Sequence, residues 1–318
     1  MSEAEPVTYL DFSYDHDRKW LQIASRYDRL NPQEDEPQSR LSIVTNDGEL
    51  TMFPLEGMLV TSAVSTRQAL WALGQGGELW TYAAGLEVPL QAWLPDSGLQ
   101  APRRLGTPQR IRLIEQNPYV CGHAGQVYAL TADGWAHMDR GIVEPEGTAS
   151  SVQLLGIHGT AADHMYVVGS KGTLAHWSGR SWTRQTLPIT STLSGVRVFS
   201  PKETVAVGDD GVFVELGRGR WNVGQVPGFE AATFSDIEGF DGRLYIAAGD
   251  KLLVRSGASW QAVDTGLAEA PQFLRLTTGG GRLWTMGSKR VHSFDGKNWV
   301  AHIDPDNVDP DDLAPDQG

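Results

Sequence analysis

One short segment holds residues whose types and spacing could bind a metal ion. His158, Asp163 and His164 fall within seven residues, and zinc accepts imidazole and carboxylate ligands. No further ligand follows at a spacing that would complete the site, and the three residues lie where a loop between two strands is expected. We interpret them as part of a solvated loop, and we predict neither a metal nor another cofactor.

The sequence lacks the established motifs of catalysis. It contains no H-E-x-x-H, G-x-S-x-G, C-x-x-C or Walker phosphate-loop pattern. Residues 169–173 (Gly-Ser-Lys-Gly-Thr) resemble a phosphate loop in composition, but they occupy the hairpin position of a repeat and no helix follows them. We therefore predict a turn at these residues and a protein without catalytic activity.

The charge balance indicates what kind of partner the surface could attract. The chain has 318 residues and a net charge of −13, of which residues 304–318 contribute −6 without any Lys or Arg. An acidic surface repels the phosphates of nucleic acid and attracts basic proteins. We predict no nucleic-acid partner, and a basic surface on any protein that binds.

The compartment can be inferred from cysteine use and from the N-terminus. Cys121 is the only cysteine, so no internal disulfide can form, which fits a reducing compartment. No apolar run reaches the length of about 18 residues that a membrane span needs. Residues 1–6 are acidic and polar and lack the basic and apolar regions of a signal peptide. These features predict a cytoplasmic protein.

The elements that must position any site are visible as a repeat. Trp182, Trp221, Trp260 and Trp299 follow one another at intervals of 39 residues. Each is preceded by a short apolar run that ends in or near glycine, such as Met-Tyr-Val-Val-Gly at 165–169. A period of roughly 40 residues with several short strands in each unit is typical of β-propellers.

The repeat extends towards the N-terminus in a weaker form. In the third unit Gly122 precedes Trp135 by 13 residues, the same spacing as in the fourth unit. The second unit has its apolar run at 69–74, and we interpret Trp93 as its closing tryptophan, delayed by an insertion. The first unit has four strands from Val7 onwards but no closing tryptophan.

Counting these units gives an all-β protein with one domain. Seven units of four antiparallel strands are expected within residues 1–303, forming a seven-bladed β-propeller. Residues 304–318 are rich in Asp and Pro and cannot bury apolar surface, so they are predicted to be an acidic disordered tail.

The order of elements in each unit resembles the bacterial WD40-like and Asp-box-like members of the β-propeller superfamily. The resemblance covers residues 58–303 well and 7–57 weakly. Residues 293–299 (Ser-Phe-Asp-Gly-Lys-Asn-Trp) are similar to the Asp box, S-x-D-x-G-x-x-W, with one residue fewer between Asp295 and Gly296. No unit carries the Trp-Asp dipeptide of true WD40 blades. The resemblance implies the propeller fold and leaves the function open.

Three irregular segments interrupt the repeat, at 25–40, 96–106 and 144–150. They join the second strand to the third within a blade, or one blade to the next, and such loops emerge on one face of a propeller. Loops on a rigid scaffold commonly carry function, so we predict a protein-binding rim here. Its candidate residues are Arg26, Asp28, Arg29, Glu34, Asp35, Glu36, Trp93, Asp96, Arg103, Arg104, Glu144 and Glu146.

Three functional hypotheses remain open at this point. The first is a protein-binding propeller, monomeric on its own, such as an immunity or antagonist protein that neutralises a basic toxin, for instance a nuclease. The second is a glycan-binding or sialidase-like propeller, suggested by the near-Asp-box and the 11 tryptophans. The third is an assembly scaffold.

Overall fold

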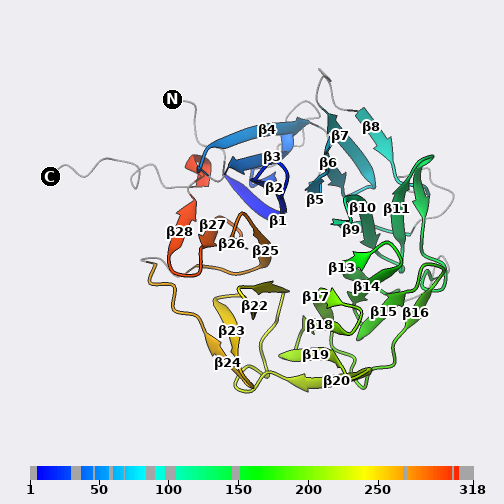
Figure 1. Ribbon diagram of the computed structural model, residues 1–318. Helices are drawn as coiled ribbons and strands as arrows, with labels where there is room; N and C mark the ends of the chain where they lie inside the picture. The colour runs from blue at the N-terminus through cyan, green and yellow to red at the C-terminus, as the bar shows by residue number, and fades with distance from the viewer. Residues whose placement is uncertain are drawn as a thin grey trace.

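The computed structural model describes residues 6–29, 37–45, 47–56, 60–67, 69–83, 90–96, 105–144, 151–267, 271–302 and 304–307. Within these residues, seven four-stranded antiparallel sheets surround a central axis (Figure 1). The chain builds one blade from each four consecutive strands, so strand order within every sheet follows the sequence. The all-β, seven-bladed β-propeller predicted from the repeat is confirmed.

The first three blades contain the less regular repeats. Blade one is made of β1 (Val7–Asp15), β2 (Trp20–Tyr27), β3 (Pro37–Thr45) and β4 (Leu50–Glu56). Blade two is made of β5 (Val60–Ser65), β6 (Ala69–Gly74), β7 (Glu78–Ala83) and β8 (Leu90–Trp93). Blade three is made of β9 (Pro108–Ile114), β10 (Asn117–Gly122), β11 (Val127–Thr131) and β12 (Gly134–His137).

The last four blades contain the regular repeats. Blade four comprises β13 (Leu154–Ala161), β14 (His164–Gly169), β15 (Thr173–Trp177) and β16 (Trp182–Arg184). Blade five comprises β17 (Leu193–Ser200), β18 (Glu203–Gly208), β19 (Val212–Gly217) and β20 (Arg220–Gln225). Blade six comprises β21 (Asp236–Phe240), β22 (Arg243–Ala248), β23 (Lys251–Ser256) and β24 (Ser259–Ala262). Blade seven comprises β25 (Arg275–Gly279), β26 (Arg282–Met286), β27 (Val291–Phe294) and β28 (Trp299–His302).

The repeated tryptophans fill the space between neighbouring blades. Trp182 is 3% exposed, and its Nε1 donates a hydrogen bond to the Met138 carbonyl oxygen, 2.6 Å away, beyond the last strand of blade three. Trp221 of blade five meets Tyr166 of blade four edge-on, with 5.6 Å between ring centroids. Each of these tryptophans therefore packs against the preceding blade, as large aromatic side chains in a core do.

The assignment of Trp93 to this repeated position is wrong. Trp135 lies at the second position of β12 and pairs across the strands with Leu130. Trp93 is instead the last residue of β8, pairs with Glu78 at the other end of its blade and is 49% exposed. Trp93 therefore lies at the opposite end of the fourth strand from the repeated tryptophan position.

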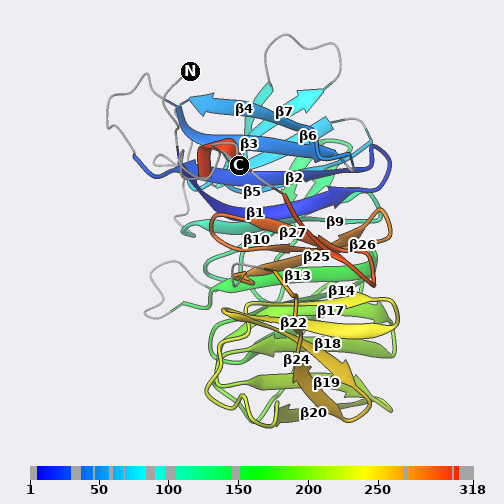
Figure 2. The same cartoon turned by 90° about the vertical axis from the view of Figure 1, so that its left-hand side faces the viewer.

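The ring closes between blade one and blade seven without sharing a strand. The Tyr9 backbone N–H donates to the Ser288 carbonyl oxygen over 2.8 Å. The rings of Tyr14 and Trp284 stack with 6.1 Å between their centroids. β1 contacts β25 and β26 of blade seven, and blades one and seven lie next to each other in both views (Figures 1 and 2). Closure therefore depends on side-chain packing and a few hydrogen bonds between the first and last blades.

Residues 304–307, expected to begin the disordered tail, are folded onto this junction. Asp304 is 5% exposed and forms an ion pair with Arg40, and Arg40 also lies 2.6 Å from a carboxylate oxygen of Asp306. The Tyr9 hydroxyl donates to Asp304 over 2.7 Å. A short 3-10 helix, η1 (Pro305–Asn307), follows. The predicted tail thus starts too early, because the buried Arg40 needs these carboxylates; residues 308–318 lie outside the described part.

Helices contribute almost nothing to the described structure. The helix η1 has three residues, and within the described part of the chain no helix is long and apolar enough to cross a membrane.

The inter-blade role of the tryptophans can be tested by truncation. Trp182→Ala should lower the free energy of unfolding by about 3–5 kcal/mol, because it empties a buried aromatic position between blades three and four. Trp93→Ala, at an exposed strand end, should change it by no more than about 0.5 kcal/mol. Urea denaturation of both variants measures the difference; equal losses would contradict the inter-blade packing.

The folded segment after residue 303 yields a second stability prediction. A chain ending at residue 303 leaves Arg40, which is 1% exposed, without either aspartate, and an unpaired buried charge costs about 3–5 kcal/mol. A chain ending at residue 307 keeps both ion pairs and should unfold like the full chain. Thermal melts that place the two truncated chains at the same temperature would show that the junction does not depend on these aspartates.

Candidate functional site

Half of the predicted rim residues fall within the described structure. Successive strands of each blade alternate in direction, so β2, β8 and β12 all end on the same face of the ring. Arg26, Asp28, Arg29, Trp93, Asp96 and Glu144 lie at or just beyond these strand ends. The other six, Glu34, Asp35, Glu36, Arg103, Arg104 and Glu146, lie outside the described residues.

The described acidic residues of the rim are held by neighbouring side chains. Asp28 accepts a hydrogen bond from the Thr8 hydroxyl over 2.6 Å and forms an ion pair with Lys289. Asp96 lies 3.2 Å from Nε2 of His137. Glu144 accepts from the Val152 backbone N–H over 2.7 Å. These three carboxylates therefore fix the junctions between blades as well as standing on the predicted rim.

The exposed members of the rim are of a different kind. Arg26 and Arg29 are exposed at the end of β2, and Trp93 is exposed at the end of β8. Tryptophan and arginine are the residue types most enriched at the energetic centres of protein interfaces. The rim therefore presents side chains suited to contact with a protein.

A second candidate site is the central channel, lined by the first strand of each blade. The pairing of first and second strands identifies two rings of equivalent positions along it. The first layer is Asp11, Ser62, Arg110, Gly156, Gly195, Asp236 and Arg275. The second layer is Ser13, Val64, Arg112, His158, Arg197, Glu238 and Thr277.

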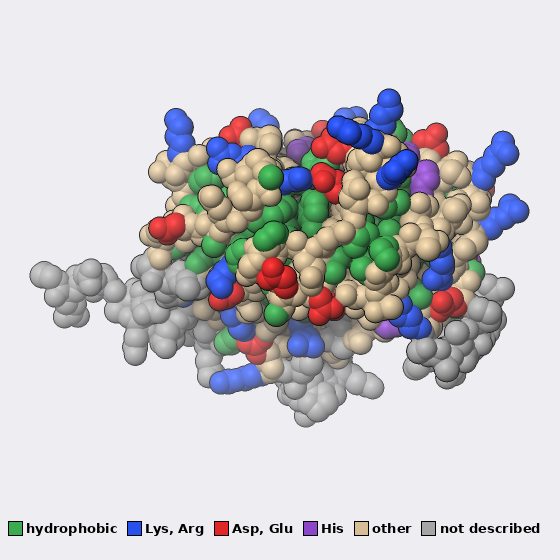
Figure 3. Space-filling view, turned by 90° about the horizontal axis from the view of Figure 1, so that it is seen from below, with side chains coloured by type: hydrophobic (Ala, Val, Ile, Leu, Met, Phe, Trp, Pro, Cys, Tyr) green, Lys and Arg blue, Asp and Glu red, His purple; other side chains and the backbone are tan. Residues whose placement is uncertain are grey.

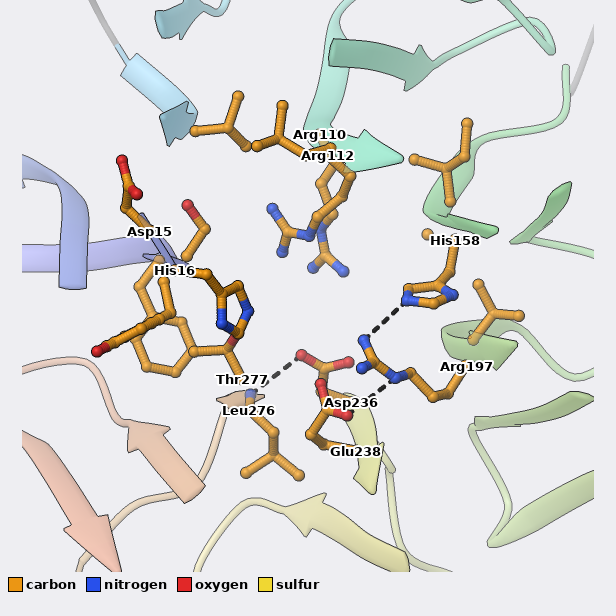
Figure 4. A pocket seen from close by; sticks show the side chains of 18 of the residues that line it. Asp15, His16, Arg110, Arg112, His158, Arg197, Asp236, Glu238, Leu276 and Thr277 are labelled. Carbon is orange, nitrogen blue, oxygen red and sulfur yellow. Dashed lines mark hydrogen bonds and ion pairs between the residues drawn. The ribbon is translucent and has the colours of Figure 1, made fainter. Parts of the chain in front are cut away.

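Two cavities occupy this channel. One of about 300 Å³ opens on the face opposite the rim and is lined largely by the second layer (Figure 4). The other, of about 110 Å³, lies towards the rim and is lined by Asp11, Arg110 and Arg275, among others. The larger cavity is lined by residues near the ends of the first strands, and the smaller cavity by residues near their beginnings. All seven first strands therefore run in the same direction along the channel. Arg110 lines both cavities.

Asp11 and Arg112 form a bidentate ion pair inside the channel. Nη1 and Nη2 of Arg112 donate to the two carboxylate oxygens of Asp11 over 2.6 and 2.7 Å. Ser62 donates a further hydrogen bond to Asp11. Burial alone would raise the pKa of the Asp11 carboxyl, but the Arg112 guanidinium outweighs burial and holds that pKa well below its usual value. Asp11 is therefore an anion that joins blade one to blade three.

His158, Arg197 and Glu238 form a second group, visible in Figure 4. Arg197 lies 2.9 Å from Glu238 through Nε and 2.7 Å from Nε2 of His158 through Nη1. The Val198 backbone N–H points at Nδ1 of the same imidazole over 3.1 Å. Burial and the Arg197 charge lower the pKa of His158 well below 6.5, so the imidazole is neutral. Burial raises the pKa of Glu238 to about 7, although Arg197 opposes the shift.

The interpretation of His158 as part of a solvated loop is wrong. His158 lies within β13 and faces the channel, whereas Asp163 lies at the hairpin that follows and His164 begins β14. His164 pairs with His176, with 2.9 Å between Nδ1 and Nε2. In the described part of the chain no group of three or more His, Cys, Asp or Glu residues is arranged to hold a metal ion.

The channel residues were missed, although the sequence carries a signal for them. His158 and Arg197 stand 39 residues apart in the second layer, and Asp236 and Arg275 stand 39 residues apart in the first, the same period as the tryptophans. A polar residue that recurs with this period within first strands indicates a position facing a polar channel instead of the core between blades. The period alone cannot say which of these residues contact one another.

The sequence is similar to one characterised protein over most of its length. No protein-family model matches the sequence. The chain is 27% identical over 234 residues to the immune protein Tsi7 of Pseudomonas aeruginosa, an alignment that covers 73% of this chain and 75% of that protein.

Solved structures show the same architecture at low sequence identity. A structure of YCF48 bound to D1 peptide covers 92% of this chain and 92% of its own, with a TM-score of 0.65 and 14% identity. The WD40 β-propeller domain of Doa1 covers 93% of this chain and 95% of its own, with a TM-score of 0.63 and 12% identity. These likenesses concern the fold alone: the chain is a seven-bladed β-propeller.

The raised pKa of Glu238 predicts a pH dependence of stability. The folded state keeps the Glu238 proton up to about pH 7, whereas the unfolded chain loses it near pH 4.5. The contribution of Glu238 to the free energy of unfolding therefore falls as pH rises between those two values. The Glu238→Gln variant has no carboxyl group to titrate and should not lose this stability. The difference in free energy of unfolding between the variant and the wild type should therefore rise by at most about 1.4 kcal/mol per pH unit.

Urea denaturation of both proteins at several pH values between 4.5 and 7 measures this difference. A difference that stays constant over the window would mean that Glu238 is ionised throughout it in the folded protein.

Proposed function

We propose that this protein acts by binding another protein, as an immunity-type antagonist, and that it performs no catalysis. The observation that carries the proposal is the similarity to the immune protein Tsi7, which extends over 73% of this chain and 75% of that protein. The similarity spans most of the ring, so it concerns the propeller as a whole. A rigid ring with irregular loops on one face suits such a role, because propellers serve widely as binding scaffolds.

The rim is the proposed contact surface, and the proposed partner is a basic toxin such as a nuclease. The exposed Arg26, Arg29 and Trp93 supply candidate anchors, and the net charge of −13 would attract a basic protein over a long range. Around the outer edge near β20 and β24, Lys and Arg side chains are interspersed with Asp and Glu (Figure 3). That edge offers no region of single charge and is not the proposed contact surface.

The test begins with the protein encoded by the gene next to that of this chain. Its expression alone should arrest growth of a bacterial host, co-expression of this chain should restore growth, and the two purified proteins should form a stable complex. If growth arrest persists while both proteins are made, and no complex forms on a sizing column, the neighbouring gene product is not the target. If the neighbouring gene product is not toxic and no complex forms, the proposal is rejected.

Charge reversal locates the contact surface. Replacing Glu34, Asp35 and Glu36 together by Lys should slow association with the basic partner and flatten its salt dependence. The matched control replaces Asp133, Asp163 and Glu203, three exposed carboxylates in hairpins on the opposite face, by Lys. Stopped-flow association rates at two salt concentrations compare the variants. Slower association in the control set alone would move the contact to the opposite face.

A further inference from the structure

Arg110 lies in the channel with a guanidinium whose N–H donors find no acceptor among the described residues. Arg110 is 7% exposed, its guanidinium faces the two cavities, and it forms no hydrogen bond or ion pair with another described residue. Burial, with Arg275 and Arg112 nearby, lowers the pKa of Arg110 to about 10, so the group remains charged at neutral pH. A buried charge without a partner is costly, and native proteins rarely keep one without a reason.

The carboxylates that act on Arg110 accept their hydrogen bonds from other groups. Both oxygens of Asp11 accept from Arg112. The two oxygens of Asp236 accept from the backbone N–H groups of Ile237 and Leu276, over 3.0 and 3.1 Å. Asp11 and Asp236 act on Arg110 through their charges without hydrogen bonds to it, and no described residue accepts a hydrogen bond from its guanidinium.

The space beside Arg110 is open. Arg110 lines both cavities, and Figure 4 shows Arg110 and Arg112 reaching into the larger cavity from β9. At the same level blades four and five carry Gly156 and Gly195, which have no side chain to pair with Arg110.

A second guanidinium lies at the same level. Arg275 also lines the cavity of about 110 Å³; its Nη1 donates to the Leu274 carbonyl oxygen over 3.0 Å, but its buried Nε has no hydrogen-bond partner among the described residues. Its nearest carboxylate oxygen, on Asp11, is 3.9 Å away. A cavity of this size holds a few atoms, more than the roughly 30 Å³ share of one water and less than a typical drug-sized site.

We propose that the rim-side cavity binds a small oxyanion, a carboxylate or a phosphate, between Arg110 and Arg275. The planar fork of an arginine matches two oxygens of either group, and charge-assisted hydrogen bonds of this kind are strong in a site away from water. The oxyanion supplies the acceptors that the channel itself lacks. This site involves neither the rim loops nor a partner protein, so its test does not depend on the function proposed above.

Calorimetric titration of the full chain with inorganic phosphate, and separately with acetate, tests the site at constant ionic strength set with sodium chloride. At least one of the two should bind saturably at one site per chain. Binding of phosphate alone, of acetate alone or of both would identify the preferred oxyanion. No saturable binding of either would overturn the proposal.

Two variants connect that binding to the channel. Arg110→Gln should weaken binding at least about tenfold, because it removes a charge-assisted donor pair. Arg180→Gln, which changes an exposed arginine in a hairpin, should bind like the wild type. Equal weakening in both variants, or none in Arg110→Gln, would place the anion elsewhere.

Stability in buffer without either oxyanion separates a ligand site from a structural ion pair. Arg110→Gln should then unfold at the same urea concentration as the wild type or at a higher one, since it removes an unpartnered buried charge. Adding the oxyanion that binds should raise the midpoint of the wild type and leave that of the variant in place. A variant that unfolds well below the wild type in oxyanion-free buffer would show that Arg110 is needed for the fold itself.

Discussion

The rest of the structure depends on one constraint: a four-stranded blade has two apolar faces and cannot cover either of them alone. Each blade must therefore pack against two others, and a closed ring is the arrangement that leaves no blade at an exposed end. Trp182 and Trp221 meet this constraint by reaching into the preceding blade. Stability consequently resides between blades as much as within them.

Ring closure also determines what happens at the centre. Seven first strands side by side cannot pack their inward-facing side chains as a core, because they surround an axis instead of meeting a second sheet. Titratable groups line the channel and join different blades: Asp11 of blade one pairs with Arg112 of blade three, and Arg197 of blade five pairs with Glu238 of blade six. Arg110 differs from these residues, because its guanidinium faces the two cavities and forms no ion pair with another described residue.

The sequence predicts the fold well because the repeated Trp and Gly residues encode local packing at a fixed interval. It fails at Trp93, since an insertion in a degenerate unit hides which end of the strand the tryptophan occupies. It fails at Asp304 because the partner, Arg40, lies 264 residues earlier. The protein-binding rim stays a prediction made from loop placement. The channel pairs could not, because which blades' side chains meet depends on ring geometry that no local pattern contains.

The junction of Arg40 with Asp304 has a consequence for how the chain is made. Arg40 leaves the ribosome 264 residues before its carboxylate partner, which at typical rates of synthesis is a delay of roughly tens of seconds. During that time blades can form and stack in order, each on the one before it, while the first blade keeps an uncovered face and an unpaired guanidinium. The ring cannot close fully until residues 304–307 are synthesised, and until then the nascent chain is an open arc of blades. The uncovered face of the first blade exposes apolar surface in that arc and makes it prone to aggregation.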